Sequence, residues 1–182
     1  MRNACREGDL NYIIKEIDSF YTMYLKKSWK YPQPIFFCAA GGQNEAIEYF
    51  IGKKLYNLDI LLESIGIAAI SNHMATVELL CKIVDKDFFP QHPKILRALE
   101  VCISKNYKKM AEYLIQKGAY IVTSDSTENT LVKCAEANNT EIMEIIMNKD
   151  PNFRESIPNA INTAIMLGHR NSVNFLAGTE MV

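Results

Sequence analysis

Apolar positions recur along the chain in blocks of 30 to 34 residues, which is a repeat much longer than one helical turn. Each block is centred on a Gly or an Asn with apolar residues at fixed distances before and after it. These six central residues are Gly8, Gly42, Asn72, Asn106, Asn138 and Gly168. Gly and Asn accept positive φ more readily than other residues, and a tight turn between two helices requires such a residue. The pattern therefore predicts six turns, each between two helices.

The residues around each turn have helical spacing. The residue seven before the turn is aliphatic or Met, and the residue five after it is always apolar. Such spacing places apolar side chains on one face of each helix. The residue four before the turn is Ala or Cys in every block, namely Ala4, Cys38, Ala68, Cys102, Cys134 and Ala164. We therefore expect six units of a short helix, a turn and a second amphipathic helix, approximately at 1–30, 31–60, 61–93, 94–125, 126–156 and 157–182.

The cysteines fit this pattern better than they fit a chemical site. Cys38, Cys102 and Cys134 occupy the small-residue position, where a free Cys packs as a small buried hydrophobe. We expect Cys81 to be packed as well, whereas Cys5, near a frayed start, is the expected reactive thiol. An odd count of five cysteines argues against a disulfide framework and favours a reducing, cytoplasmic environment.

Two segments resemble the signature of ankyrin repeats, Thr-Pro-Leu-His-x-Ala-Ala-x-x-Gly. They are QPIFFCAAGG at 33–42 and NTLVKCAEAN at 129–138, and YLIQKGA at 113–119 resembles the Leu-Leu-x-x-Gly-Ala that closes such a repeat. The resemblance covers essentially the whole chain. It implies an all-α fold, a solenoid of about six ankyrin-like helix-turn-helix repeats with irregular linking loops, in one domain over 1–182. Other helical-hairpin repeats are the structural rivals, but their helices are longer than a turn every 30 residues allows.

Linkers between the units are predicted at 26–31, 52–59, 85–93, 118–126 and 150–158. Pro90 and Pro93 mark the third linker as a break between helices. The stretch 53–63 contains no helix breaker, so part of it can be helical.

Composition and charge exclude several kinds of partner. Lys and Arg together number 20 against 21 Asp and Glu, so the chain lacks the basic excess that nucleic acid or an anionic membrane surface demands. No apolar run reaches the ~18 residues of a membrane span, and no apolar signal core follows Arg2. We therefore expect no nucleic-acid partner and no membrane partner.

No recognised catalytic or phosphate-binding motif is present in the sequence. His73 and His169 each follow a turn residue, where the resemblance implies local hydrogen bonds, and His92 lies in a predicted loop. The carboxylates at 85–87 and 141–144 are interpreted as solvated charges. We therefore expect no catalytic residue, no metal and no cofactor, and a protein that is not an enzyme.

A solenoid of paired helices presents a concave surface made of its first helices and the adjoining loops, and such surfaces bind other proteins. We therefore hypothesise a protein–protein interaction module that binds a partner protein through this face, for instance a viral or bacterial host-interacting factor or inhibitor. The alternative is a small effector enzyme on a degenerate helical-repeat scaffold, with Cys5 or a loop histidine as its working group. By resemblance, the exposed concave positions are the two residues before each turn: Arg6, Glu7, Ala40, Gly41, Ile70, Ser71, Ser104, Lys105, Glu136, Ala137, Met166 and Leu167.

Candidate contact residues come from that face and from aromatic linkers. Apolar side chains stand at Ile70, Met166 and Leu167 where a soluble surface is normally polar, although Leu167 can instead turn inward. The linker aromatics either contact a partner or cover the core beneath them. The candidate partner-binding residues are Trp29, Tyr31, Ile70, Phe88, Phe89, Lys105, Asp125, Glu136, Met166 and Leu167. The short apolar last helix leaves two further alternatives, self-association through the C-terminal repeat or a chain that is a fragment of a longer protein.

Overall fold

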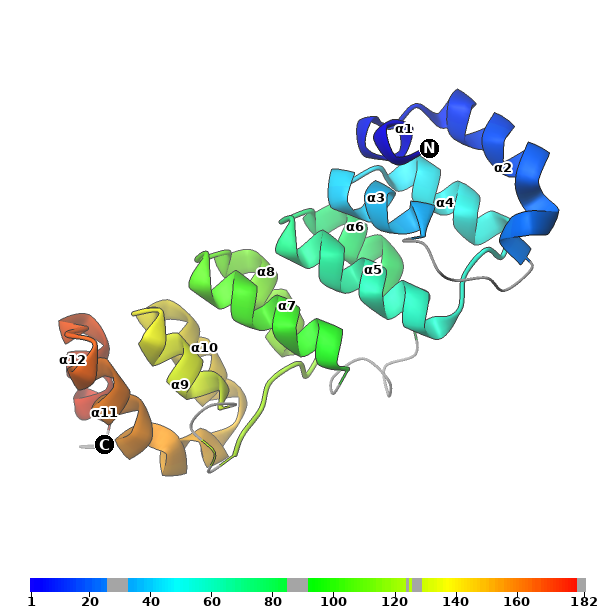
Figure 1. Cartoon of the computed structure of the whole chain (residues 1–182). Coiled ribbons are helices and arrows are strands. Elements are labelled where there is room, and N and C mark those ends of the chain that lie inside the picture. The colour runs from blue at the N-terminus through cyan, green and yellow to red at the C-terminus, as the bar shows by residue number, and fades with distance from the viewer. Residues whose placement is uncertain (26–32, 85–91, 124, 126–128, 180–182) are drawn as a thin grey trace. The chain divides into compact units, whose positions relative to one another are not determined.

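The computed structural model is all-helical in the residues that it describes, 1–25, 33–84, 92–123, 125 and 129–179, which confirms the predicted fold class at that level (Figure 1). Six helices lie in the first half of the chain, namely α1 (Arg2–Glu7), α2 (Leu10–Leu25), α3 (Pro34–Gly41), α4 (Asn44–Gly52), α5 (Leu58–Ile70) and α6 (Met74–Cys81). The second half contains α7 (Pro93–Ser104), α8 (Lys108–Gln116), α9 (Thr130–Glu136), α10 (Thr140–Lys149), the short 3₁₀ helix η1 (Pro151–Ser156), α11 (Ile157–Met166) and α12 (Arg170–Thr179).

All six predicted turn residues have positive φ. The angles are 78° at Gly8, 70° at Gly42, 62° at Asn72, 56° at Asn106, 52° at Asn138 and 72° at Gly168. Each of these residues separates an odd-numbered helix from the next even-numbered one, as in α1 and α2. We call each such pair of helices a hairpin, and its odd-numbered member the first helix. The prediction of six left-handed turns is confirmed.

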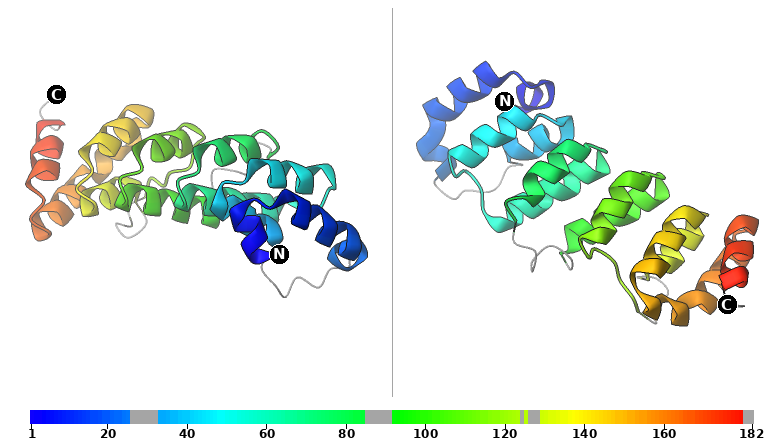
Figure 2. Two further views of the ribbon diagram at one scale, coloured as in Figure 1. Left: turned by 90° about the horizontal axis from the view of Figure 1, so that it is seen from above. Right: turned by 180° about the vertical axis from the view of Figure 1, so that it is seen from behind.

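The described hairpins are grouped into two compact units, Met1–Phe88 and Phe89–Val182. In the first unit α1, α3 and α5 pack in chain order as one row, and α2, α4 and α6 form a second row against it. In the second unit α7, α9 and α11 form the row of first helices, and α8, α10 and α12 form the other row (Figure 2). Whether 1–182 forms one continuous domain stays a prediction.

The small-residue position lies in the core. Cys38, Cys102 and Cys134 are fully buried, which confirms that they serve as packing residues. Cys5, the expected reactive thiol, is also fully buried in α1, so the structure does not place it at the surface. Cys81 is half-buried at the end of α6.

In four hairpins, the side chain directly after the turn residue connects the hairpin to the one before it. Each of these four side chains donates a hydrogen bond to a backbone carbonyl of the preceding first helix. The bonds are Gln43 Nε2 to Arg6 O (3.0 Å), His73 Nε2 to Ala40 O (3.0 Å), Asn139 Nδ2 to Ile103 O (3.4 Å) and His169 Nδ1 to Ala135 O (2.9 Å). We call them the inter-hairpin hydrogen bonds. The two histidines were expected to bond locally, and the structure shows that they bridge neighbouring hairpins instead.

The linkers contain more helix than the sequence predicts. The segment 150–158, expected as a loop, forms η1 and the first residues of α11. Asp150 starts η1 by accepting a hydrogen bond from the Asn152 amide at 3.0 Å, and the ring of buried Phe153 lies 5.6 Å from that of Tyr120. Pro158 lies in the first turn of α11, where its missing N–H has no consequence.

Two other predicted linkers also contain the start of a helix. Pro93 begins α7 instead of only separating helices, whereas Pro90 lies outside the described residues. The stretch 53–63 is partly helical as predicted, because α5 begins at Leu58.

Candidate functional site

The candidate contact residues fall into three groups. Trp29, Tyr31, Phe88 and Phe89 lie outside the described residues. Ile70 is half-buried at the end of α5. The exposed candidates are Lys105, Asp125, Glu136, Met166 and Leu167.

The two positions before each turn residue are accessible in all six hairpins. Each of these twelve residues is either exposed or half-buried, and none is part of the core. Leu167 is 52% exposed, which excludes the alternative that it turns inward. In the second unit these positions border a groove between two neighbouring first helices.

This α7/α9 groove is lined by Glu100, Val101 and Ser104 of α7 and by Lys133, Glu136 and Ala137 of α9. Its volume is about 480 Å³, and it is open to solvent on one side. Sequence reasoning had placed Ser104, Glu136 and Ala137 on the binding face. It missed Glu100, Val101 and Lys133, although these lie about one helical turn before the predicted positions and therefore on the same side of their helices.

The α7/α9 groove is lined by more acidic than basic side chains. Lys133 Nζ lies 3.0 Å from Glu136 Oε2, so one end of the groove carries an ion pair within α9. Glu100 contributes a second carboxylate from α7, and its side chain is exposed. Two carboxylates against one ammonium group leave the groove with an excess negative charge.

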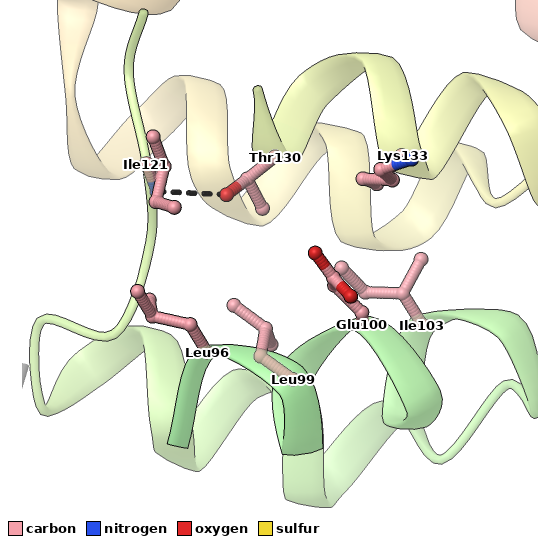
Figure 3. A pocket seen from close by; sticks show the side chains of 7 residues that line it. All are labelled: Leu96, Leu99, Glu100, Ile103, Ile121, Thr130 and Lys133. Atoms are coloured by element: carbon pink, nitrogen blue, oxygen red, sulfur yellow. Dashed lines mark hydrogen bonds between the residues drawn. The ribbon is translucent and has the colours of Figure 1, made fainter. Parts of the chain in front are cut away.

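A second, much smaller cavity lies between the same two helices (Figure 3). Its volume is about 10 Å³, which is at most enough for one water molecule. The apolar side chains of Leu96, Leu99 and Ile103 line it from α7, and the Ile121 amide crosses its edge to donate to Thr130 Oγ1 at 2.8 Å. The cavity is a packing gap, whereas the α7/α9 groove is open to solvent.

On the first unit, the row of first helices combines an aromatic ring with two cations. The Arg2 and Arg6 guanidinium groups of α1 lie 5.1 and 5.9 Å from the ring centroid of Phe37 in α3. Both arginines are exposed, and such distances are typical of cation–π contacts. The side chains thus keep their charge at the surface while covering part of the ring.

Four of the five cysteines are buried, and their surroundings change the pKa of each of these four thiols. Burial raises the pKa of the Cys102 thiol to about 12 and also raises the pKa of Cys134. The Cys38 and Cys5 thiols share a hydrogen bond that raises the pKa of Cys38 and lowers that of Cys5. Within the described part of the chain, no group of three or more His, Cys, Asp or Glu side chains is arranged to hold a metal ion.

The largest exposed apolar side chains gather at the end of α11. Ile165 is 59% exposed, Met166 is 86% exposed and Leu167 follows directly. Met166 and Leu167 were predicted as contact residues, whereas Ile165 was not, because only the two positions directly before each turn residue were assigned to the exposed face.

Among the helices that the structure describes, none is long and apolar enough to cross a membrane.

The comparisons with known proteins leave the chain without an assigned family. No protein-family model matches the chain, and no curated protein matches it.

Proposed function

We propose that this chain is a solenoid of ankyrin-like repeats that acts as a protein–protein interaction module. Three observations support the repeat architecture: six left-handed turn residues at the predicted spacing, two rows of helices within each unit, and the inter-hairpin hydrogen bonds. Repeats of this kind present their first helices as an extended binding surface.

The α7/α9 groove is the observation that carries the functional proposal. Its lining includes three residues that the repeat pattern assigns to the expected binding face, Ser104, Glu136 and Ala137. Ser104 and the carboxylates of Glu100 and Glu136 supply hydrogen-bond acceptors on two neighbouring helices. A groove of this chemistry fits an extended or helical segment of a partner protein.

The exposed Met166 side chain extends the same row of first helices beyond the groove. Methionine adapts to irregular apolar surfaces because its chain is unbranched and polarizable. The partner segment that fits best therefore carries a basic residue opposite Glu100 and an apolar residue opposite Met166. No step of this proposal requires a catalytic group or a cofactor.

Affinity purification of the tagged chain followed by mass spectrometry tests the proposal. Ser104→Trp fills the groove, and Met166→Asp places a charge on its apolar extension. Lys109→Trp on α8 and Met147→Asp on α10 are controls because they introduce the same two side chains on second helices.

We expect one stoichiometric protein that both controls retain and that both face variants lose, with at least about a tenfold rise in Kd for the purified pair. A partner that binds the face variants as tightly as the unchanged chain contradicts the proposed face. Circular dichroism of all four variants verifies that their helix content is unchanged.

A further inference from the structure

Two cysteines meet where the first two hairpins pack together. Cys5 lies in α1 and Cys38 in α3, and both are fully buried. Their thiols share a hydrogen bond, so the two sulfur atoms are neighbours. Cys5 is the residue three before its turn, and Cys38 is the residue four before the next turn. The other neighbouring first helices within each unit have different residues at these two positions: Ala39 and Ala68, Ile103 and Cys134, and Ala135 and Ala164.

The backbones of α1 and α3 come close together beside these thiols. A Cβ atom added at Gly41 would lie 3.0 Å from Arg6 Cα and closer still to Arg6 O, so no larger residue fits there. Arg6 directly follows Cys5, and Gly41 lies about one helical turn after Cys38. A disulfide requires Cα atoms roughly 4.4–6.8 Å apart and side chains that point toward each other. The close approach at Gly41 and the contact between the thiols both favour such a bond.

We propose that Cys5 and Cys38 are an oxidation site, at which a peroxide converts the two thiols into a disulfide that joins α1 to α3. The structure holds both residues as thiols, and a dithiol reductant restores this state after oxidation. Both cysteines belong to the first unit, so the proposal does not depend on partner binding at the α7/α9 groove.

Cys5 is the attacking thiol. The hydrogen bond from Cys38 lowers the pKa of Cys5, and the thiolate is the form that reacts with a peroxide. The Cys5 sulfur attacks one peroxide oxygen, the O–O bond breaks, and the leaving hydroxide takes up the thiol proton. Cys5 becomes a sulfenic acid, and one water molecule is released.

Cys38 is the resolving thiol. Its pKa is raised by the hydrogen bond with Cys5, by burial and by the charge of the Cys5 thiolate. The first and the last of these causes disappear once Cys5 is a neutral sulfenic acid, so Cys38 then loses its proton more readily. Its sulfur attacks the Cys5 sulfur, the S–O bond breaks, and hydroxide leaves with the Cys38 proton as a second water. Two thiols thus lose two electrons, and one peroxide is reduced to two water molecules.

Access to Cys5 depends on α1, because the thiol is fully buried. Helix α1 has only six residues, and no side chain hydrogen-bonds at its N-cap. Helices this short are marginal without their packing, and such elements open locally more easily than a core does. Hydrogen peroxide is scarcely larger than water, so a brief opening of α1 admits it.

Peptide mapping after oxidation tests the proposal. The protein carries Cys81→Ser, which removes the half-buried thiol. It is treated with hydrogen peroxide at neutral pH, then with catalase, and its remaining thiols are alkylated in denaturant. We expect two of the four remaining thiols to be lost, with a cross-linked peptide that joins Cys5 to Cys38 and that dithiothreitol separates. Circular dichroism verifies that the protein stays folded during oxidation.

Two controls separate this pair from burial alone. Cys102 and Cys134 are also fully buried on neighbouring first helices, but at one equivalent position, and both should stay thiols. Cys5→Ala and Cys38→Ala are the matched variants, because other hairpins carry Ala at both positions. Cys5→Ala should leave Cys38 a thiol, whereas Cys38→Ala should leave Cys5 as a sulfenic acid that dimedone traps.

Three results would overturn the proposal. The first is that Cys5 and Cys38 both stay thiols in the folded, peroxide-treated protein. The second is a cross-link between Cys102 and Cys134 that forms to the same extent, since burial alone would then explain the bond. The third is oxidation of Cys38 in the Cys5→Ala variant to the same extent as in its parent.

Discussion

Asn129 is the side chain whose loss should destabilise the second unit most clearly. It is fully buried and makes four hydrogen bonds. Its Oδ1 caps α9 by accepting from the Leu131 amide at 2.9 Å and the Val132 amide at 3.4 Å. Its Nδ2 donates to Thr123 O at 2.7 Å and to Ser156 Oγ at 2.8 Å, which connects the preceding loop and η1 to this helix.

Substitution Asn129→Ala removes both functions at once. Loss of the N-cap costs about 1 kcal/mol. The Thr123 carbonyl and the buried Ser156 hydroxyl then lose a partner, and each costs about 1 kcal/mol or more when water does not replace it. The expected loss in the free energy of unfolding is therefore about 3 kcal/mol. Asn129→Ser keeps a capping oxygen but not the two donors, so its cost should be smaller by about the value of the cap.

Urea denaturation followed by far-UV circular dichroism measures both variants against the unchanged chain. The m-value should stay constant, since the surface exposed on unfolding does not change. An Asn129→Ala variant that loses less than about 1 kcal/mol, or that is no worse than Asn129→Ser, would refute the assignment of separate capping and bridging roles.

Two further predictions concern ionisation. Hydrogen bonds from Lys53 and Tyr49 lower the pKa of Asp18, so its stabilising contribution is present above the unfolded pKa and is lost as the pH falls through the folded pKa. Asp18→Asn should therefore lower the Tm at pH 7 but not at about pH 2, and a difference that persists in acid would contradict this cause. In the native chain at about pH 8, a thiol reagent should react first with half-buried Cys81, whereas Cys102, with its pKa raised to about 12, should react only on unfolding. A fast phase that remains after Cys81→Ser would show that one of the buried thiols is accessible.

The turns of the hairpins could be predicted because each turn depends on the identity of a single residue. A left-handed turn between helices accepts few side chains, so Gly and Asn at 30 to 34 residue spacing located all six turns. The linker at 150–158 could not be predicted in this way. Pro158 signals a helix break in the sequence, but a proline is equally compatible with the first turn of a helix, which is where the structure places it.

The exposure of the candidate contact residues was predicted in part, for a similar reason. Ser104, Glu136 and Met166 follow from their distance to a turn residue, which is a local property. The exposure of Ile165 is not local, because the same position is buried wherever another first helix covers it. Sequence spacing identifies the side of a helix, whereas the neighbour on that side is known only from the structure.

The inter-hairpin hydrogen bonds have a consequence for how this surface can change. Their acceptors are backbone carbonyls, which every residue type supplies. Side chains on the exposed side of a first helix can therefore be replaced without deleting any of these bonds. The contacts between hairpins and the exposed side of the first helices use different atoms, so residues on that side can vary, or be redesigned, while the hairpins stay joined.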